Sequence, residues 1–220
     1  MLPRPERAVS LVIEGLDDDA AVTAMARAMA SPFDVTGAAH VPAGAAGAAA
    51  RTVLRVEGMA RQGGYRAGEL ARVLACHGSV ERLEGEAHTA LWREIRDVAP
   101  LTGRAGAVWR LSLKPSDAPP AVAAIRKTLA RTALDCAVLY DWAGGLVWLL
   151  TAETGDAGAG AIRRETAARG GHATLVRASA ATRAAVEVFE PEPETLARIA
   201  AGLRAKFDPA GILNPGRMRG

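Results

Sequence analysis

Cysteine is scarce in this chain, and its two cysteines lie far apart in the sequence. Cys76 and Cys136 form no Cys-x-x-Cys motif, and no pair of histidines accompanies them at metal-ligand spacing. The sequence therefore excludes an iron–sulfur centre held by this chain alone. We expect two free, buried thiols, the usual state in a reducing cytoplasm.

Aromatic residues and long apolar runs are also scarce. Aromatic side chains make up 4% of the chain, so alanine and the branched aliphatic residues must fill the core. No stretch approaches the roughly 18 consecutive apolar residues of a membrane span. The segment Met1–Pro5 lacks the apolar region of a signal peptide. These absences predict a soluble protein in the cytoplasm.

The charge pattern argues against a nucleic-acid partner. The net charge is +3 and the sequence pI is about 9.2, but the arginines are interspersed with acidic residues. Surfaces that bind nucleic acid usually combine a basic stripe with stacking aromatics, and the sequence has no such stripe. The 220 residues, half of them hydrophobic, suffice for one or two globular units.

Two segments of the sequence repeat one pattern. Leu11 and Ile13 alternate as in a strand, and Leu111 and Leu113 do the same in the second segment. An aspartate stands where each following helix should begin, Asp17 in the first segment and Asp117 in the second. Apolar residues then recur at the spacing of one buried helix face: Val22, Met25 and Met29, and later Val122, Ile125 and Leu129.

The remaining elements extend the repeat. In the first half we expect strands over 33–40 and 52–57 joined by a small-residue loop at 42–50, a helix over 66–75 and a strand over 80–83. The counterparts are strands over 135–142 and 146–150, a helix over 159–169 and a strand over 173–177, with a separate helix over 86–98 between the halves. The predicted fold is α+β: a duplicated ferredoxin-like arrangement (βαββαβ twice, about 7–85 and 106–178), in which an antiparallel sheet carries helices on one face.

The end of the chain, 192–220, combines a helix with a specific tail. Leu196, Ile199, Leu203 and Phe207 recur at helical spacing, Pro209 forbids continuation, and Pro215 forces Asn214 into an extended conformation. The tail Phe207-Asp208-Pro209-Ala210-Gly211-Ile212-Leu213-Asn214-Pro215-Gly216 resembles the FDPxGxLNPG ending of FAD-linked oxidoreductases of the vanillyl-alcohol oxidase / p-cresol methylhydroxylase superfamily. In that family the Asn-Pro turn lies beside the flavin, which implies a cofactor-binding role for Asn214.

The resemblance extends along residues 1–220. The chain is similar to the C-terminal cap half of the flavin-binding subunits of bacterial glycolate oxidases, and the matching pieces include 37–42, 54–58, 83–86, 140–142 and 171–177. Such proteins hold FAD mainly through a glycine-rich N-terminal domain, which is absent from this chain, and Leu2–Pro5 resembles the linker that would leave it. The resemblance implies a small 2-hydroxy acid substrate, partner subunits that include an iron–sulfur subunit, and peripheral membrane association through that complex.

Strand alternation suggests a substrate-binding face. If Trp109, Leu111 and Leu113 face the helices, Arg110 faces the opposite side, and the same argument places Arg55 and Glu57 opposite Leu54 and Val56. Guanidinium groups bind carboxylates bidentately, as binding of a 2-hydroxy acid requires. The alternative is a structural ion pair of Glu57 with Arg55 or with Arg110.

The hairpin end supplies further candidates. Tyr140, as a substrate-binding residue, and Asp141 and Trp142, as cofactor-binding residues, could form a rim against a flavin edge, although strands also carry aromatics for cross-strand packing. The segment Gly155–Gly160 is not a phosphate loop, because it has neither the GxGxxG spacing nor a Lys-Ser/Thr pair.

Histidines offer weak candidates for acid–base catalysis. His40 and His172 lie at strand ends and could titrate near neutral pH, although a hydrogen-bonded structural histidine is commoner. His77 and His88 have no partner pattern and are expected on the surface. The related large subunit of glycolate oxidases carries a Gly-Glu-His-Gly motif with a metal-binding histidine. Gly171-His172-Ala173-Thr174 does not reproduce it, so we expect no metal and leave open whether this subunit oxidises substrate or relays electrons.

Two functions are consistent with these patterns. The first is the cap domain of a FAD-dependent oxidoreductase subunit that acts on a 2-hydroxy acid, in which the flavin performs the redox step. The second is a non-catalytic module that docks the subunits of a flavoprotein complex.

Both halves carry complete core patterns, but the chain offers no credible cradle for the FAD diphosphate. We therefore expect the isolated chain to unfold cooperatively on heating and to bind FAD weakly. Circular dichroism and absorbance of the purified protein test both points. A yellow protein with stoichiometric flavin would contradict weak FAD binding. A non-cooperative, dye-binding state would contradict cooperative unfolding.

Overall fold

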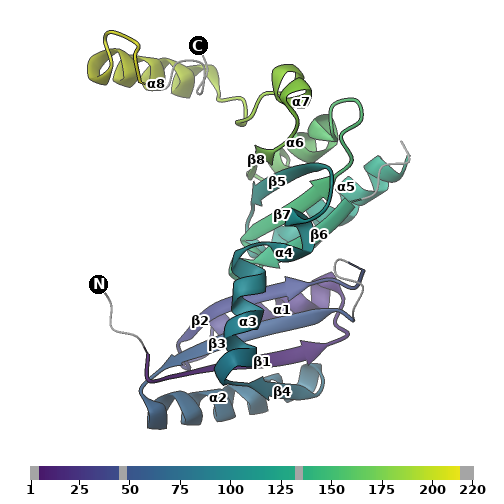
Figure 1. Cartoon of the computed structure of the whole chain (residues 1–220), viewed down its shortest axis with the longest axis vertical. Helices are drawn as coiled ribbons and strands as arrows, with labels where there is room; N and C mark the ends of the chain where they lie inside the picture. The colour runs from purple at the N-terminus through teal and green to yellow at the C-terminus, as the bar shows by residue number, and fades with distance from the viewer. Residues whose placement is uncertain (1–4, 45–48, 132–135, 214–220) are drawn as a thin grey trace.

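Eight strands of the described chain form one antiparallel sheet (Figure 1). The computed structural model describes residues 5–44, 49–131 and 136–213. Within these ranges the strands lie in the order β4-β1-β3-β2-β6-β7-β5-β8, and each hydrogen-bonded pair is antiparallel. The strands are β1 (Arg7–Glu14), β2 (Val35–Val41), β3 (Arg51–Gly58), β4 (Val80–Leu83), β5 (Ala107–Ser112), β6 (Cys136–Asp141), β7 (Leu146–Thr151) and β8 (His172–Arg177).

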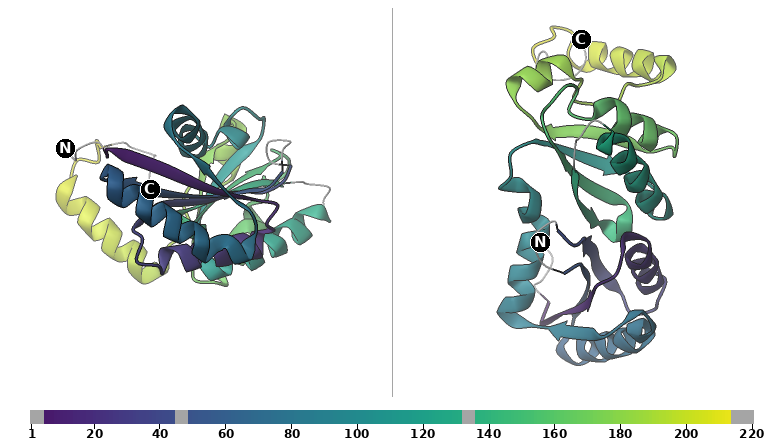
Figure 2. Two further views of the ribbon diagram at one scale, coloured as in Figure 1. Left: turned by 90° about the horizontal axis from the view of Figure 1, so that it is seen from below. Right: turned by 90° about the vertical axis from the view of Figure 1, so that its right-hand side faces the viewer.

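Helices cover both faces of this sheet, as the views along it show (Figure 2). The main core lies between the sheet and four helices: α1 (Asp18–Met29), α2 (Ala60–Leu74), α5 (Ala118–Ala130) and α6 (Ala159–Ala167). On the opposite face lie α3 (Gly85–Arg96) and the single-turn α4 (Ala99–Thr102). Two further helices, α7 (Ala180–Ala185) and α8 (Glu194–Phe207), follow the last strand.

The α+β class and the antiparallel sheet are confirmed, but the expectation of helices on one face is wrong. Leu91 and Ile95 of α3 pack in a second core with Val12 and Val53 of the sheet. Several strands carry apolar residues on both faces, so each face has to be covered. The helix between the halves therefore covers the second face instead of merely linking two units.

Each half of the sheet has its own strand order, and the two orders match. The first half runs β4-β1-β3-β2 and the second runs β8-β5-β7-β6, so the halves meet where β2 lies beside β6. A single register pair, His40 with Tyr140, joins β2 to β6, whereas β1 and β3 are paired along their whole length. The junction between the halves therefore needs support from side chains.

Helices α1 and α5 begin and bury their faces as the sequence patterns predicted, with two exceptions, whereas α2 begins at Ala60 and not at the expected residue 66. Asp17 caps α1, because its carboxylate accepts a hydrogen bond of 2.8 Å from the Ala20 backbone N–H. Asp117 occupies the corresponding position before α5, but its side chain makes no capping hydrogen bond. Met29 lies in the last turn of α1 and is exposed, although the spacing predicted it to be buried.

The carboxylate of Asp18, the first residue of α1, connects the two halves. The Tyr140 hydroxyl, from β6, donates to Asp18 Oδ2 at 2.8 Å, and Arg126 Nη1, from α5, lies 3.1 Å from the same oxygen. His40 Nε2 lies 3.5 Å from Oδ1, while its Nδ1 is 2.9 Å from the Thr52 hydroxyl. Burial alone would raise the pKa of Asp18, but the approach of His40, the hydrogen bond from Tyr140 and the charge of Arg126 hold it below its usual value.

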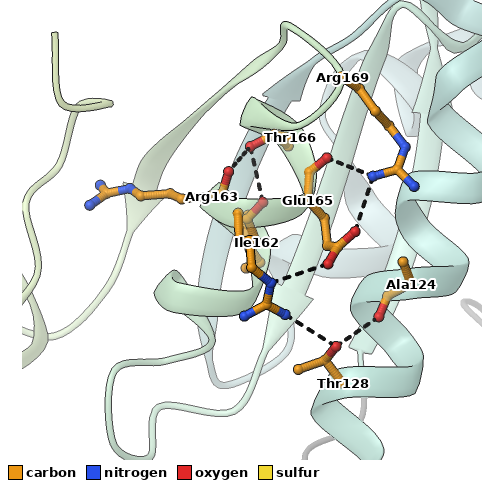
Figure 3. A network of polar contacts seen from close by, with 8 residues as sticks. Ala124, Thr128, Ile162, Arg163, Glu165, Thr166 and Arg169 are labelled. Carbon is orange, nitrogen blue, oxygen red and sulfur yellow. Dashed lines mark hydrogen bonds and ion pairs between the residues drawn. The ribbon is translucent and has the colours of Figure 1, made fainter. Parts of the chain in front are cut away.

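A smaller polar network ties α6 to α5 (Figure 3). Arg169 donates to the Glu165 carbonyl and carboxylate, and Arg164 bridges Glu165 and Thr128 of α5. Thr166 donates back to the Ile162 carbonyl within α6. Ion pairs at such solvent-accessible positions contribute little to stability, so the apolar contacts between the two helices matter more for their packing.

The burial of the two cysteines was predicted correctly for one of them. Cys136 is buried as predicted, but Cys76 is exposed and lies outside the core.

Helix α8 forms as predicted and extends away from the sheet (Figure 1), and its apolar residues Leu196, Ile199, Leu203 and Phe207 are all exposed. Among the described residues, no helix is both long and apolar enough to cross a membrane.

The Asp18 network predicts a specific pH dependence of stability. Because the pKa of Asp18 is lowered in the folded state, its stabilising contribution is complete above its unfolded pKa of about 3.9 and is lost as the pH falls through the folded value. Asp18→Asn should therefore lower the free energy of unfolding at pH 7 and flatten its decline below about pH 5. Tyr140→Phe should lower it by about 1.5–3 kcal/mol.

Urea unfolding between pH 3 and pH 7 measures both effects, with the exposed neighbour Asp19 as control. Asp19→Asn should change stability by less than about 1 kcal/mol, through the helix dipole alone. Equal acid sensitivity of Asp18→Asn and wild type would show that Asp18 does not link the halves in this way.

Candidate functional site

The second face of the sheet contains a groove that draws residues from both halves. Its volume is about 920 Å³, and α3 forms one of its walls. The first half contributes Arg55 of β3, and the helix between the halves, α3, contributes His88 and Trp92. The second half contributes Arg110 of β5, Asp141 and Trp142 at the end of β6, and Trp148 of β7. Arg55 and Arg110 thus lie on the face opposite the main core, as strand alternation predicted.

Arg55 is held in a fixed orientation by neighbours on three sides. Its guanidinium lies 4.7 Å from the centre of the Trp92 ring, within the range of a cation–π contact. Its Nε lies 3.2 Å from both the Thr36 hydroxyl and Glu57 Oε2, and Nη2 donates to the Thr36 carbonyl at 3.1 Å. The structural ion pair with Glu57 therefore exists, but it uses only part of the guanidinium fork. Among the described residues, Nη1 makes no hydrogen bond.

Gly37 of β2 makes room for this arrangement. A Cβ atom at Gly37 would lie 2.8 Å from Cη2 of Trp92 and 3.3 Å from Nε of Arg55. The absence of a side chain therefore allows the indole to lie directly against the strand, which in turn fixes the surface on which Arg55 stacks.

Arg110 differs from Arg55 because it has no carboxylate partner among the residues that the structure describes. It is exposed, its register partners are Trp148 and Thr174, and its guanidinium lies 5.6 Å from the centre of the Trp142 ring. An ion pair with Glu57, one of the alternatives for this arginine, is not found in the described part of the chain. Arg110 is therefore a cation with donors available to a ligand.

Asp141 and Trp142 form the hairpin end of the groove. Asp141 Oδ1 accepts a 2.8 Å hydrogen bond from the Trp142 backbone N–H, and Trp142 has a left-handed φ of 50°. Burial raises the pKa of Asp141, although that hydrogen bond and the charge of Arg55 act in the opposite direction. The Trp142 side chain is 64% exposed, so its ring is available for contact at the mouth of the groove.

Other candidates from the sequence lie elsewhere. Tyr140 and His40 face the main core and are fully buried in the Asp18 network, so the structure does not bring them to the groove. His172 is exposed at the start of β8, where it pairs with Ser112, and is not among the residues that line the groove. Asn214 lies outside the described residues.

His88 is the groove residue that sequence reasoning missed. It was expected on the surface, but it is buried, and its Nδ1 lies 2.8 Å from the hydroxyl of the fully buried Ser10. Burial and the charge of Arg55 lower its pKa, with Glu57 and Glu84 acting in the opposite direction. The available signal was its spacing from Leu91 and Ile95, which places it on the buried side of α3.

The charge of the groove favours an anion. Four arginines line it, and Asp141 is the acidic residue among its lining. Two of the four, Arg93 and Arg96, lie on α3, where Arg96 pairs with Asp97. The lining therefore carries a net positive charge, to which Arg55 of the first half and Arg110 of the second both contribute.

The residues described here do not fit the diphosphate of FAD. The sequence segment closest to a phosphate loop lies before α6, where Asp156 accepts hydrogen bonds from the Gly158 and Gly160 backbone N–H groups at 3.0 and 2.7 Å. Its own carboxylate therefore occupies the donors that a phosphate needs. Among the described residues, no group of three His, Cys, Asp or Glu is placed to hold a metal ion.

Comparisons with known proteins agree with the motifs of the sequence. No family model matches the chain. Over 129 residues it is 35% identical to the glycolate oxidase subunit GlcE of Escherichia coli (strain K12), a match that covers 58% of this chain and 30% of GlcE. The chain therefore matches less than a third of the length of this relative.

Solved structures share the fold over nearly the whole chain. A p-cresol methylhydroxylase with substrate bound superposes with a TM-score of 0.65 at 15% identity, covering 99% of this chain and 53% of that one. An alkyldihydroxyacetonephosphate synthase gives a TM-score of 0.57 at 12% identity, covering 98% and 44%. The chain is thus similar in sequence to GlcE and shares the fold of p-cresol methylhydroxylase and alkyldihydroxyacetonephosphate synthase.

The close approach at Gly37 yields a stability prediction. Gly37→Ala should force the Trp92 ring away from β2 and lower the free energy of unfolding by about 1–3 kcal/mol, because the packed ring has little room to move. Gly68→Ala, in α2, is the matched control. A Cβ there meets no atom within 4 Å, so this change should stabilise the protein by about 0.5–1 kcal/mol.

Urea unfolding measures both variants, and near-ultraviolet circular dichroism reports the tryptophan environment. A Gly37→Ala protein with wild-type stability and an unchanged spectrum would show that Trp92 does not lie against this strand.

Proposed function

We propose that this chain is the substrate-side cap domain of a FAD-dependent oxidoreductase subunit of the glycolate oxidase type, and that its groove binds the carboxylate of a small 2-hydroxy acid. The observation that carries the proposal is the placement of Arg110 and Arg55, one from each half, on one groove, with Arg110 free of any described carboxylate partner. The sequence match to GlcE supports the choice of a 2-hydroxy acid.

The two arginines have different roles in this proposal. Arg55 is already oriented by Thr36, Glu57 and Trp92, so it loses little side-chain freedom when a ligand binds. Arg110 supplies the unneutralised charge and a fork that can bind both carboxylate oxygens. Asp141 is the acidic residue of the lining, and burial raises its pKa.

In the proposed subunit, a flavin supplies the two-electron oxidation and FAD is held mainly by a domain outside this chain. The chain would contribute the substrate side, with Trp142, Asp141 and Asn214 toward the cofactor. Transfer of electrons to partner subunits, including an iron–sulfur subunit, and a cytoplasmic location belong to the same proposal.

The proposal also covers the domain organisation. We interpret the chain as one cap domain, 1–220, made of two ferredoxin-like pseudo-repeats at about 7–85 and 106–178 followed by the C-terminal helix and tail. The matching strand orders of the two halves support this interpretation.

A second candidate function is a non-catalytic module that docks the subunits of a flavoprotein complex. The exposed apolar face of α8 favours it, because four large apolar residues on one helix face are unusual on a free surface. Under this alternative the groove has no role in substrate binding, and substitution of its arginines would not change glycolate affinity.

Substitution of Arg110 tests the proposed function. Arg110→Met keeps much of the side-chain bulk but deletes the charge and the donors, so glycolate affinity should fall about ten- to hundredfold, the effect of losing a charge-assisted contact. Stability should change little, since Arg110 is exposed. Titration of the 220-residue protein with glycolate, followed by tryptophan fluorescence and NMR chemical shifts, measures the affinity.

Arg61→Met, an exposed arginine of α2, is the matched control and should bind glycolate like wild type. Glu57→Gln tests the alternative in which the Arg55–Glu57 pair is structural. Loss of this pair should lower the free energy of unfolding and have a smaller effect on the free energy of glycolate binding. Unchanged affinity in a well-folded Arg110→Met protein would remove Arg110 from the site.

A further inference from the structure

We infer that His88 is held as a single neutral tautomer by Ser10 and Trp92, and that its Nε2–H group is a hydrogen-bond donor to the ligand in the groove. The tautomer follows from the geometry of three buried or half-buried groups. The role toward a ligand rests on the proposed function of the groove.

Ser10 lies at the centre of this arrangement. Its hydroxyl, fully buried on β1, lies 2.8 Å from His88 Nδ1 and 2.9 Å from Trp92 Nε1. Both partners come from α3, so the helix meets the sheet through a polar contact within an otherwise apolar interface. In this series of hydrogen bonds, each of the three groups must donate or accept in a direction compatible with its neighbours.

The direction of each hydrogen bond is fixed by elimination. An indole N–H can only donate, so Ser10 Oγ accepts from Trp92. The serine proton then needs an acceptor, because a buried hydroxyl without one costs stability. Among the described residues, His88 Nδ1 is the acceptor within hydrogen-bond distance of Ser10 Oγ. Nδ1 therefore carries no proton, and the proton of the neutral ring lies on Nε2.

The surroundings of His88 favour its neutral form. Protonation would place a second donor on the serine hydroxyl and leave the serine proton without its acceptor. Burial and the charge of Arg55 also lower the pKa of His88, and the carboxylates that oppose them, Glu57 and Glu84, are engaged by Arg55 and Arg7. A neutral, fixed donor is the expected state near pH 7.

This state determines what His88 can do in the groove. The residue lines the groove together with Arg55, and Nε2 makes no hydrogen bond among the described residues. With Nδ1 occupied, Nε2–H can donate to a carboxylate, hydroxyl or carbonyl oxygen of the ligand, but it cannot accept a proton. We therefore assign His88 to ligand binding, with Ser10 and Trp92 as positioning residues, and exclude it as the base that takes the hydroxyl proton.

The tautomer can be measured without any ligand. Long-range ¹H–¹⁵N NMR spectra of the labelled 220-residue protein distinguish a protonated Nε2 from a protonated Nδ1. We expect His88 to remain neutral with the proton on Nε2 between about pH 6 and 8, a range that brackets the ordinary histidine pKa. Ser10→Ala should release this preference, giving mixed tautomers and a raised pKa. Ser112→Ala, on β5, is the matched control and should leave the His88 signals unchanged. A wild-type ring protonated on Nδ1 would overturn the inference, whatever the protein binds.

The donor role is tested by glycolate titration. His88→Leu should weaken binding about three- to tenfold, the effect of losing one neutral hydrogen bond. His88→Gln, which retains an N–H donor, should recover part of this loss and keeps the test valid if the leucine variant does not fold. Wild-type affinity in a folded His88→Leu protein would overturn the donor role while leaving the result for Arg110→Met intact. Failure of wild type to bind glycolate would overturn the proposed function and the donor role together, but not the tautomer.

Discussion

The Asp18 carboxylate is the polar interaction that connects the two halves, within an apolar core that is continuous between them. In the described parts of the chain, one register pair joins the halves through the backbone, so the sheet alone would join them weakly. Asp18 belongs to the first half and receives hydrogen bonds from Tyr140 and Arg126 of the second. It also draws His40, a member of that register pair, into the same network. The pairing of β2 with β6 and the side-chain cluster thus reinforce each other at one point.

The groove on the opposite face inherits its geometry from this junction. Arg55 comes from the first half and Arg110 from the second, so the distance between their charges depends on how the halves are joined. On the first side, Gly37, Trp92 and Arg55 form a stack that leaves the guanidinium little freedom. On the second side, the described residues give Arg110 a contact with Trp142 but no carboxylate partner. The groove therefore combines one arginine fixed by several contacts with one that has few.

Sequence patterns predicted the parts of the structure that depend on local periodicity. Alternation placed Arg55 and Arg110 on the face opposite Trp109 and Leu111, and the order of strands and main helices followed from caps, turns and helical spacing. The tail and the internal motifs indicated a resemblance that agrees with the sequence match to GlcE and the shared fold. All these signals are encoded within single elements, where neighbouring residues determine the outcome.

The remaining features depend on contacts between elements that periodicity does not specify. Tyr140 faces the main core because β6 is buried on both faces, with Leu139 on one side and Tyr140 on the other, so its apolar pattern does not fix its direction. Helix α3 covers the second face because several strands carry apolar residues on both faces. His88 looked like an isolated surface histidine because its partner, Ser10, is far away in the sequence and meets it only when α3 packs on β1.

The separation of the two arginines across the junction has a thermodynamic consequence. An anion that contacts both would form a second cross-link between the halves, on the face opposite Asp18. Ligand binding and the joining of the two halves would then be thermodynamically linked. An interaction that stabilises the junction would preorganise the groove and raise ligand affinity, and ligand binding would stabilise the junction by the same free energy. Ligand affinity would then be controlled in part by a carboxylate that the ligand never meets.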